Sequence, residues 1–120
     1  MDAPLNLPED LLETVARRFR MLGEPQRLRI LQTLQGGEKT VTRIVEEVEG
    51  NQSNISRHLQ ALFDSGLVSR RREGTAILYS IADPVIFKLC DLVCESAREE
   101  AREKLVKLSN ALPQRPKRRS

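Results

Sequence analysis

The chain has 120 residues, enough for one domain with a hydrophobic core but short for two. Charged residues make up 31% and hydrophobic residues 39% of it, which is typical of a folded globular protein and not of a disordered one. No apolar run approaches the roughly 20 residues that cross a bilayer. The acidic N-terminal segment MDAPLNLPEDLLE lacks the pattern of a secretory signal. We therefore expect a cytoplasmic protein with no membrane partner.

The net charge of +3 is unevenly placed along the chain. The final segment PQRPKRRS holds Arg115, Lys117, Arg118 and Arg119, so the rest of the chain is close to neutral. We predict one domain over residues 8–111, followed by a basic, disordered tail over residues 112–120. Two roles are open for this tail, a solvated end or contact with phosphate groups.

Apolar residues at the helical period predict four helices before residue 66. They cover residues 8–22, 25–35, 42–48 and 53–65. Pro25 suits the first position of the second helix, because its missing N–H is not needed there. Ser53 is the predicted N-cap of the fourth helix. The predicted buried stripe of the fourth helix is Ile55, Leu59, Leu62 and Phe63.

The pattern changes after Gly66. Two extended runs, residues 67–72 and 76–81, flank Glu73-Gly74-Thr75 and predict a β-hairpin. Asp83-Pro84 then opens a long final helix that reaches about Leu108 or Ala111. The fold class is therefore mainly α with a β-hairpin wing (α+β), in the order α-α-α-α-β-β-α. This order predicts a winged helix-turn-helix.

The start of the fourth helix carries side chains suited to DNA. Serine, asparagine and glutamine can bond base edges or phosphates, and no acidic residue lies between Asn51 and Gln60 to repel DNA. The hairpin adds three arginines, of which strand alternation turns one or two toward DNA. Each feature alone also fits a solvated face, but their order and spacing favour binding to double-stranded DNA. The predicted DNA-contacting residues are Gln52, Ser53, Asn54, Ser56, Arg57, His58, Arg70, Arg71, Arg72 and Thr75.

Several motifs between Phe19 and Ile81 also match a known family. They are Leu22-Gly23-x-Pro25-x-Arg27-Leu28-x-Ile30-Leu31, Ser53, Ser56-Arg57-His58-Leu59, Leu62, Gly66-Leu67-Val68, Arg72-x-Gly74 and Tyr79. In these motifs the chain resembles the ArsR/SmtB family of bacterial winged-helix repressors. The resemblance implies a homodimer built from the first and last helices, a palindromic operator, and repression that an effector relieves.

The final helix independently favours a dimer. It carries an apolar stripe whose centre is made of small residues, so that another helix can approach closely. A helix of about 25 residues is roughly 38 Å long, too long for this chain to cover alone. The stripe consists of Ile86, Leu89, Cys90, Val93, Ala97, Ala101, Leu105 and Leu108.

Two metal sites that the resemblance suggests are incomplete. Where some members carry paired cysteines at the start of the third helix, this chain has Thr40 and Thr42. At the site on the last helix, Asp83 and Glu99 match, but Val85 and Ser96 replace the two histidines. Two carboxylates without imidazole make a poor zinc site, so we expect no zinc sensing.

The two cysteines, Cys90 and Cys94, are one helical turn apart on neighbouring positions of one face. Three interpretations are open. They pack as small hydrophobes, they bind a soft metal or metalloid ion together with a second chain, or they react with an oxidant or a sulfur species. The sequence establishes no cofactor, and a soft metal or metalloid ion is the one candidate.

The predicted function is sequence-specific repression of transcription, with release from the operator by a thiol-directed effector. The chain offers no nucleophile elbow, phosphate-binding loop or metal-ligand cluster, so we predict that it is not an enzyme. Three alternatives remain: a regulator that senses neither metal nor thiol chemistry, an activator, and a winged-helix module that contacts only other proteins.

Overall fold

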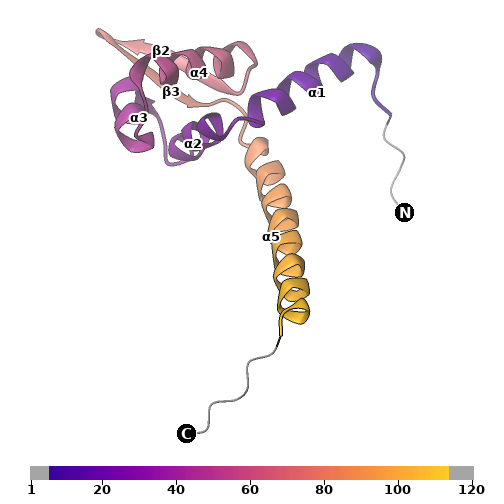
Figure 1. Ribbon diagram of the computed structural model, residues 1–120. Coiled ribbons are helices and arrows are strands. Elements are labelled where there is room, and N and C mark those ends of the chain that lie inside the picture. The colour runs from indigo at the N-terminus through magenta and orange to yellow at the C-terminus, as the bar shows by residue number, and fades with distance from the viewer. Residues whose placement is uncertain (1–5, 114–120) are drawn as a thin grey trace, which may run out of the picture. The chain divides into compact units, whose positions relative to one another are not determined.

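The computed structural model describes residues 6–113, and the chain forms two compact units that meet in sequence between Asp83 and Pro84 (Figure 1). The first unit contains α1 (Glu9–Leu22), α2 (Pro25–Leu34), β1 (Lys39–Thr40), α3 (Val41–Val48), α4 (Gln52–Asp64), β2 (Val68–Glu73) and β3 (Ala76–Ile81). The second contains α5 (Val85–Ala111). The predicted order is confirmed, with one short strand added. The single domain over residues 8–111 stays a prediction, and residues 114–120 of the predicted tail lie outside the described residues.

Local side-chain bonds explain where the helices begin. Pro25 occupies the first turn of α2, as predicted, and the Glu24 carboxylate accepts the backbone N–H of Arg27 at 3.2 Å. At the start of α3 the hydroxyl of Thr40 accepts the N–H of Arg43 at 3.2 Å. Each bond satisfies an N–H that has no partner within its own helix.

The predicted N-cap of α4 was wrong by two residues. The cap is Asn51, whose side-chain oxygen accepts the backbone N–H groups of Ser53 and Asn54 at 2.9 and 3.2 Å. Asn51 has an extended backbone, as a cap requires, and Ser53 lies inside the first turn. Ser53 therefore keeps its hydroxyl free of a capping role.

The wing is an antiparallel hairpin of β2 and β3. Val68 pairs with Ile81 at its base and Glu73 pairs with Ala76 at its tip, so the turn itself is Gly74-Thr75. Gly74 has φ +62°, a left-handed conformation that glycine adopts without strain. The short β1 pairs with the other edge of β3, which gives the strand order β1-β3-β2. Two residues are too few to show strand alternation, so the sequence did not predict β1.

The core of the first unit lies where α2, α3 and α4 pack on one another and against the hairpin. It is entirely aliphatic at its centre, and burying each such side chain contributes about 1.5–3 kcal/mol. The fully buried residues are Ile30, Leu31, Leu34, Ile44, Ile55, Leu59, Leu62 and Leu67. The predicted α4 stripe is confirmed for Ile55, Leu59 and Leu62, whereas Phe63 is only half-buried.

The helices α1 and α5 keep large apolar side chains exposed. No residue of α1 is buried, and on α5 only Ile86 is buried. The exposed side chains include Leu11, Leu12, Phe19, Leu92, Val93, Leu105 and Leu108. Over residues 6–113, no helix is long and apolar enough to cross a membrane.

Candidate DNA-binding surface

The N-terminal half of α4 presents a polar surface. Ile55 and Leu59 are fully buried, which fixes the rotation of the helix about its axis. The residues between and before them are exposed except for the half-buried His58, and the first turn contains no acid. The helix dipole adds partial positive charge at this end. The exposed predicted contacts on α4 are Gln52, Ser53, Asn54, Ser56 and Arg57.

Arg57 and Asn54 are linked on this surface. The guanidinium of Arg57 donates a hydrogen bond from Nη2 to Oδ1 of Asn54, one turn earlier on the same helix. The bond holds the two side chains side by side. Arg57 offers only donors, whereas the amide of Asn54 offers both donors and an acceptor. Such a pair matches the hydrogen-bonding groups that base edges present in a major groove.

His58 differs from its neighbours, because its ring faces another helix. Its Nδ1 accepts a hydrogen bond from Nε of Arg27 at 3.2 Å, and its Nε2 lies 3.6 Å from the carboxylate of Glu24. Both partners belong to the start of α2. The side chain is about 22% exposed. A direct contact between His58 and DNA stays a prediction, and packing between helices is the role that the structure displays.

The three wing arginines have different surroundings. Arg70 donates from Nη1 to Oε1 of Gln60 at 2.9 Å, and its guanidinium lies over the ring of Phe63. Because strand residues alternate, Arg72 shares the face of Arg70. Within residues 6–113 no hydrogen bond or ion pair reaches Arg72, so its charge faces solvent. Thr75 is also exposed, in the turn at the tip of the wing.

Arg71 points to the opposite face and is held there by acids. It donates to both carboxylate oxygens of Glu38 at 2.7 and 2.8 Å, and to Glu73 at 2.9 Å. Hydrogen bonding to Arg71 lowers the pKa of Glu38, and the two acids raise the pKa of Arg71. The predicted contact of Arg71 with DNA therefore competes with two existing ion pairs.

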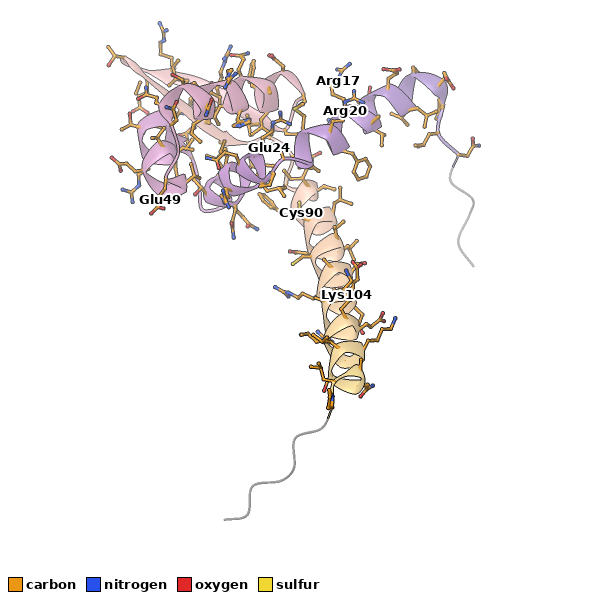
Figure 2. The ribbon with its side chains drawn as sticks, in the orientation of Figure 1. Arg17, Arg20, Glu24, Glu49, Cys90 and Lys104 are labelled. Atoms are coloured by element: carbon orange, nitrogen blue, oxygen red, sulfur yellow. The ribbon has the colours of Figure 1, made fainter. Side chains whose placement is uncertain are left out.

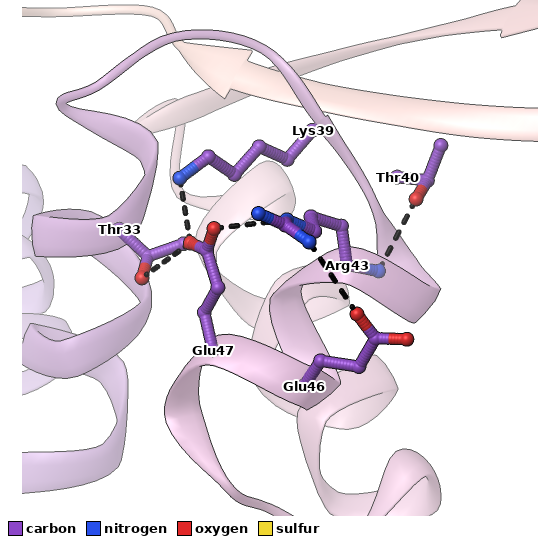
Figure 3. A network of polar contacts seen from close by, with 6 residues as sticks. All are labelled: Thr33, Lys39, Thr40, Arg43, Glu46 and Glu47. Carbon is purple, nitrogen blue, oxygen red and sulfur yellow. Dashed lines mark hydrogen bonds and ion pairs between the residues drawn. The ribbon is translucent and has the colours of Figure 1, made fainter.

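A polar network fixes α3 next to β1 and α2 (Figure 3). At its centre Glu47 accepts from Lys39 at 2.6 Å, from Arg43 at 3.0 Å and from Thr33 at 3.2 Å. Hydrogen bonding to Lys39 lowers the pKa of Glu47. Its members come from three elements, so no single sequence pattern indicated it. The network holds α3, the first helix of the helix-turn-helix, in place where it packs against α4.

The two cysteines lie on α5, where Figure 2 shows Cys90 near the start of the helix. Both thiols are free, Cys90 is half-buried and Cys94 is exposed. Burial and, secondarily, the charge of Asp91 raise the pKa of the Cys90 thiol. In the part of the chain that the structure describes, no three His, Cys, Asp or Glu side chains are grouped so that they could hold a metal ion.

This arrangement defines a winged helix-turn-helix, with α3 and α4 as the helix pair and β2–β3 as the wing. Comparison with known proteins specifies it further. The model of the arsR family of bacterial regulatory proteins matches residues 24–70. A probable mercury resistance operon repressor of Streptomyces lividans is 43% identical over 81 residues, which are 68% of this chain and 62% of that protein.

Two further relatives match over most of their own length. An uncharacterized HTH-type transcriptional regulator of Methanocaldococcus jannaschii is 38% identical over 69% of this chain and 94% of that protein. A solution NMR structure from Mycobacterium bovis, described as a homodimeric winged helix-turn-helix DNA-binding domain of a possible ArsR-family regulator, has a TM-score of 0.69 at 38% identity. It covers 82% of this chain and 92% of that one.

The chain belongs to the ArsR family of bacterial regulatory proteins. The predicted family, fold and class of DNA-binding transcriptional regulator are thereby confirmed. No comparison tests the individual DNA contacts or the cysteines, which stay predictions.

Proposed function

We propose that this chain is a homodimeric repressor that binds a palindromic operator in double-stranded DNA. The observation that carries the proposal is the acid-free, exposed N-terminal half of α4, on the same domain as the solvent-facing cation Arg72. Serine, amide and guanidinium groups on such a helix can bond base edges, and the wing cation can bond phosphates. The repressor named among the relatives supports this direction of regulation.

A second copy of the chain is the partner that best covers the exposed apolar residues. Phe19 on α1 is 54% exposed and Val93 on α5 is 58% exposed, although both are large hydrophobic side chains. The homodimeric relative supports this assignment. In this proposal residues 8–111 act together as the DNA-binding and dimerisation domain, in the cytoplasm and without enzymatic activity.

Two copies related by a twofold axis present two α4 helices. Each helix needs its own major groove, so the half-sites must lie about one helical turn apart, roughly 34–36 Å. A change in the dimer that moves the two α4 helices apart, or rotates one relative to the other, removes one of them from its groove. This geometry makes DNA affinity sensitive to what happens on α5.

We further propose that a thiol-directed effector releases the chain from its operator. Cys90 belongs to the apolar stripe of α5 and Cys94 borders it, one turn further on. Soft ions prefer thiolate ligands, and a second chain would add its own pair of thiols to these two. The raised pKa of Cys90 lowers its thiolate fraction at neutral pH, which favours a soft ion that displaces the proton over a direct oxidant. The relative named as a probable mercury resistance operon repressor supports a soft metal ion as the effector.

Selection from random DNA duplexes tests the proposal directly. The purified full chain should enrich a palindrome whose half-sites are about 10–10.5 base pairs apart, centre to centre. A reporter gene placed behind the selected sequence should then fall in expression when the chain is present. Enrichment of no sequence would favour a module that contacts only proteins, and a rise in reporter expression would indicate an activator.

A further inference from the structure

Arg27 lies on α2, and its side chain bonds to two other helices of the first unit, α1 and α4. From α2 its Nε donates to Nδ1 of His58 on α4 at 3.2 Å. Its Nη1 donates to the backbone oxygens of Arg20 and Met21, in the last turn of α1, at 3.2 and 3.4 Å. Its backbone N–H is held by Glu24, the N-cap of α2. Figure 2 shows Arg20 and Glu24 on either side of the junction between α1 and α2.

The charge and geometry of these bonds favour one fixed orientation of the Arg27 side chain. The last carbonyls of a helix have no partners within it and carry partial negative charge, so a guanidinium there is favourable. The guanidinium is a flat fork with donors at fixed angles. Nη1 of Arg27 bonds to the end of α1 and Nε bonds to α4. A displacement of either helix therefore strains the bond to the other.

We propose that Arg27 is a positioning residue that couples the end of α1 to the recognition helix through His58. The inference rests on the proposed function, in which α4 binds the operator. His58 directly follows Arg57 on α4, so the bond from Arg27 fixes the helix next to the residues that contact bases. Contacts to base edges require placement to within about 0.5 Å. A loosened His58 therefore reduces operator affinity although Arg27 itself touches no DNA.

The coupling also works in reverse. Free-energy coupling between two sites is reciprocal, so operator binding at α4 must change the environment of the α1 end. The N–H of Gly23, which donates to the oxygen of Arg20 at 3.2 Å, reports on this end. The exposed apolar residues of α1 belong to the proposed dimer interface. Arg27 therefore couples this interface to the recognition helix α4.

Arg27→Gln tests the coupling, because glutamine lacks the fork and the charge. Arg29→Gln is the matched control, since Arg29 lies two residues further on α2 and, among residues 6–113, donates only to Gln26 on its own helix, at 3.2 Å. We expect Arg27→Gln to lower affinity for the selected operator about tenfold. Affinity for an unrelated duplex, and the dependence of binding on salt, should match the parent and Arg29→Gln.

Two results would overturn the proposal. Unchanged operator affinity in Arg27→Gln would remove the positioning role. An equal loss on both duplexes, with a salt dependence reduced by about one counterion, would identify Arg27 as a phosphate contact instead. If Arg27→Gln does not fold, Arg27→Lys replaces it: lysine keeps the charge but has one nitrogen for two helices, and parent-like operator binding in this variant would equally remove the role.

A double variant tests whether Arg27 acts through His58. His58→Phe keeps an aromatic ring but removes the acceptor nitrogen. The pair Arg27→Gln, His58→Phe should lose no more operator affinity than Arg27→Gln alone, because both changes break the same bond. Additive losses would mean that His58 contacts DNA independently of Arg27.

Amide hydrogen exchange tests the α1 side of the coupling. Operator binding should slow exchange of the Gly23 amide in the parent and in Arg29→Gln, but not in Arg27→Gln. An equal effect in all three proteins, or none in the parent, would overturn the link to α1. A parent that selects no operator at all would instead contradict the proposed function, so the two failures are distinguishable.

Discussion

The guanidinium of Arg70 lies over the ring of Phe63, with 4.0 Å between its Cζ and the ring centroid. The same guanidinium donates to Gln60, so the wing is fixed to the C-terminal half of α4 at two points. The helical period predicted Phe63 in the core, but its side chain is only half-buried. The contact explains this difference, because one face of the ring lies against Arg70.

A double-mutant cycle measures this contact. A cation over an aromatic ring at an exposed site contributes about 0.5–1 kcal/mol. We expect Arg70→Ala to lower the free energy of unfolding by about this amount more in the parent than in a Phe63→Leu background, where the bond to Gln60 remains. Urea denaturation of the four proteins gives the values. Additive losses would show that the ring and the cation do not interact.

The wing arginines should differ in their effect on DNA binding. Arg72 has no partner among the described residues, so Arg72→Ala should weaken binding to all sequences alike and reduce the slope of log affinity against log salt by about one. Arg71 must leave Glu38 and Glu73 before it can bond a phosphate, so Arg71→Ala should change the slope less. Equal slopes for the parent and Arg72→Ala would contradict a wing contact with phosphate.

The order of the elements could be predicted from the sequence, but the contacts of the wing could not. The order of elements, the buried side of α4 and its exposed polar side followed from apolar spacing. The partners of the arginines did not, because Arg71 and Glu38 are 33 residues apart and meet only in the folded chain. The same holds for His58, whose bond to Arg27 spans 31 residues. The cap of α4 was misplaced since Asn51 and Ser53 are both good capping residues.

Acid should weaken the fold through Glu47. Its pKa is lowered from 4.5 in the folded chain, so its ion pairs stabilise the fold above that pH and are lost as pH falls through the lowered value. The urea midpoint of the parent should therefore decrease between pH 7 and about pH 3. Glu47→Gln should make the decrease smaller. Glu46→Gln is the control, because within the described residues Glu46 makes one ion pair, with Arg43 at 3.7 Å, and its side chain is 62% exposed. A decrease of the same size in all three proteins would contradict this role of Glu47.

The two cysteines should differ in reactivity. Cys94 is exposed, whereas burial and Asp91 raise the pKa of Cys90, so less of the reactive thiolate forms there. Iodoacetamide should therefore modify Cys94 first at neutral pH, and modification of Cys90 should accelerate as pH rises. Mass spectrometry of peptides over time measures both rates. Equal rates at neutral pH would contradict this difference.

The proposed effector response depends on the same two thiols. Mercuric ion or arsenite, added to the protein on its selected operator, should release the parent but not the double variant Cys90→Ser, Cys94→Ser. Binding of the variant without effector should equal that of the parent. If the parent ignores both reagents, or the variant responds as the parent does, the cysteines only pack in the helix interface.

The central claim is that the N-terminal half of α4 recognises the operator. Its most direct test is the operator affinity of Ser56→Ala and Arg57→Ala at one fixed salt concentration. A good base contact contributes about 1–3 kcal/mol, so each variant should bind the operator roughly five- to 150-fold more weakly than the parent. Ser56→Ala should leave binding to an unrelated duplex unchanged. If both variants bind the operator as tightly as the parent, α4 does not recognise it.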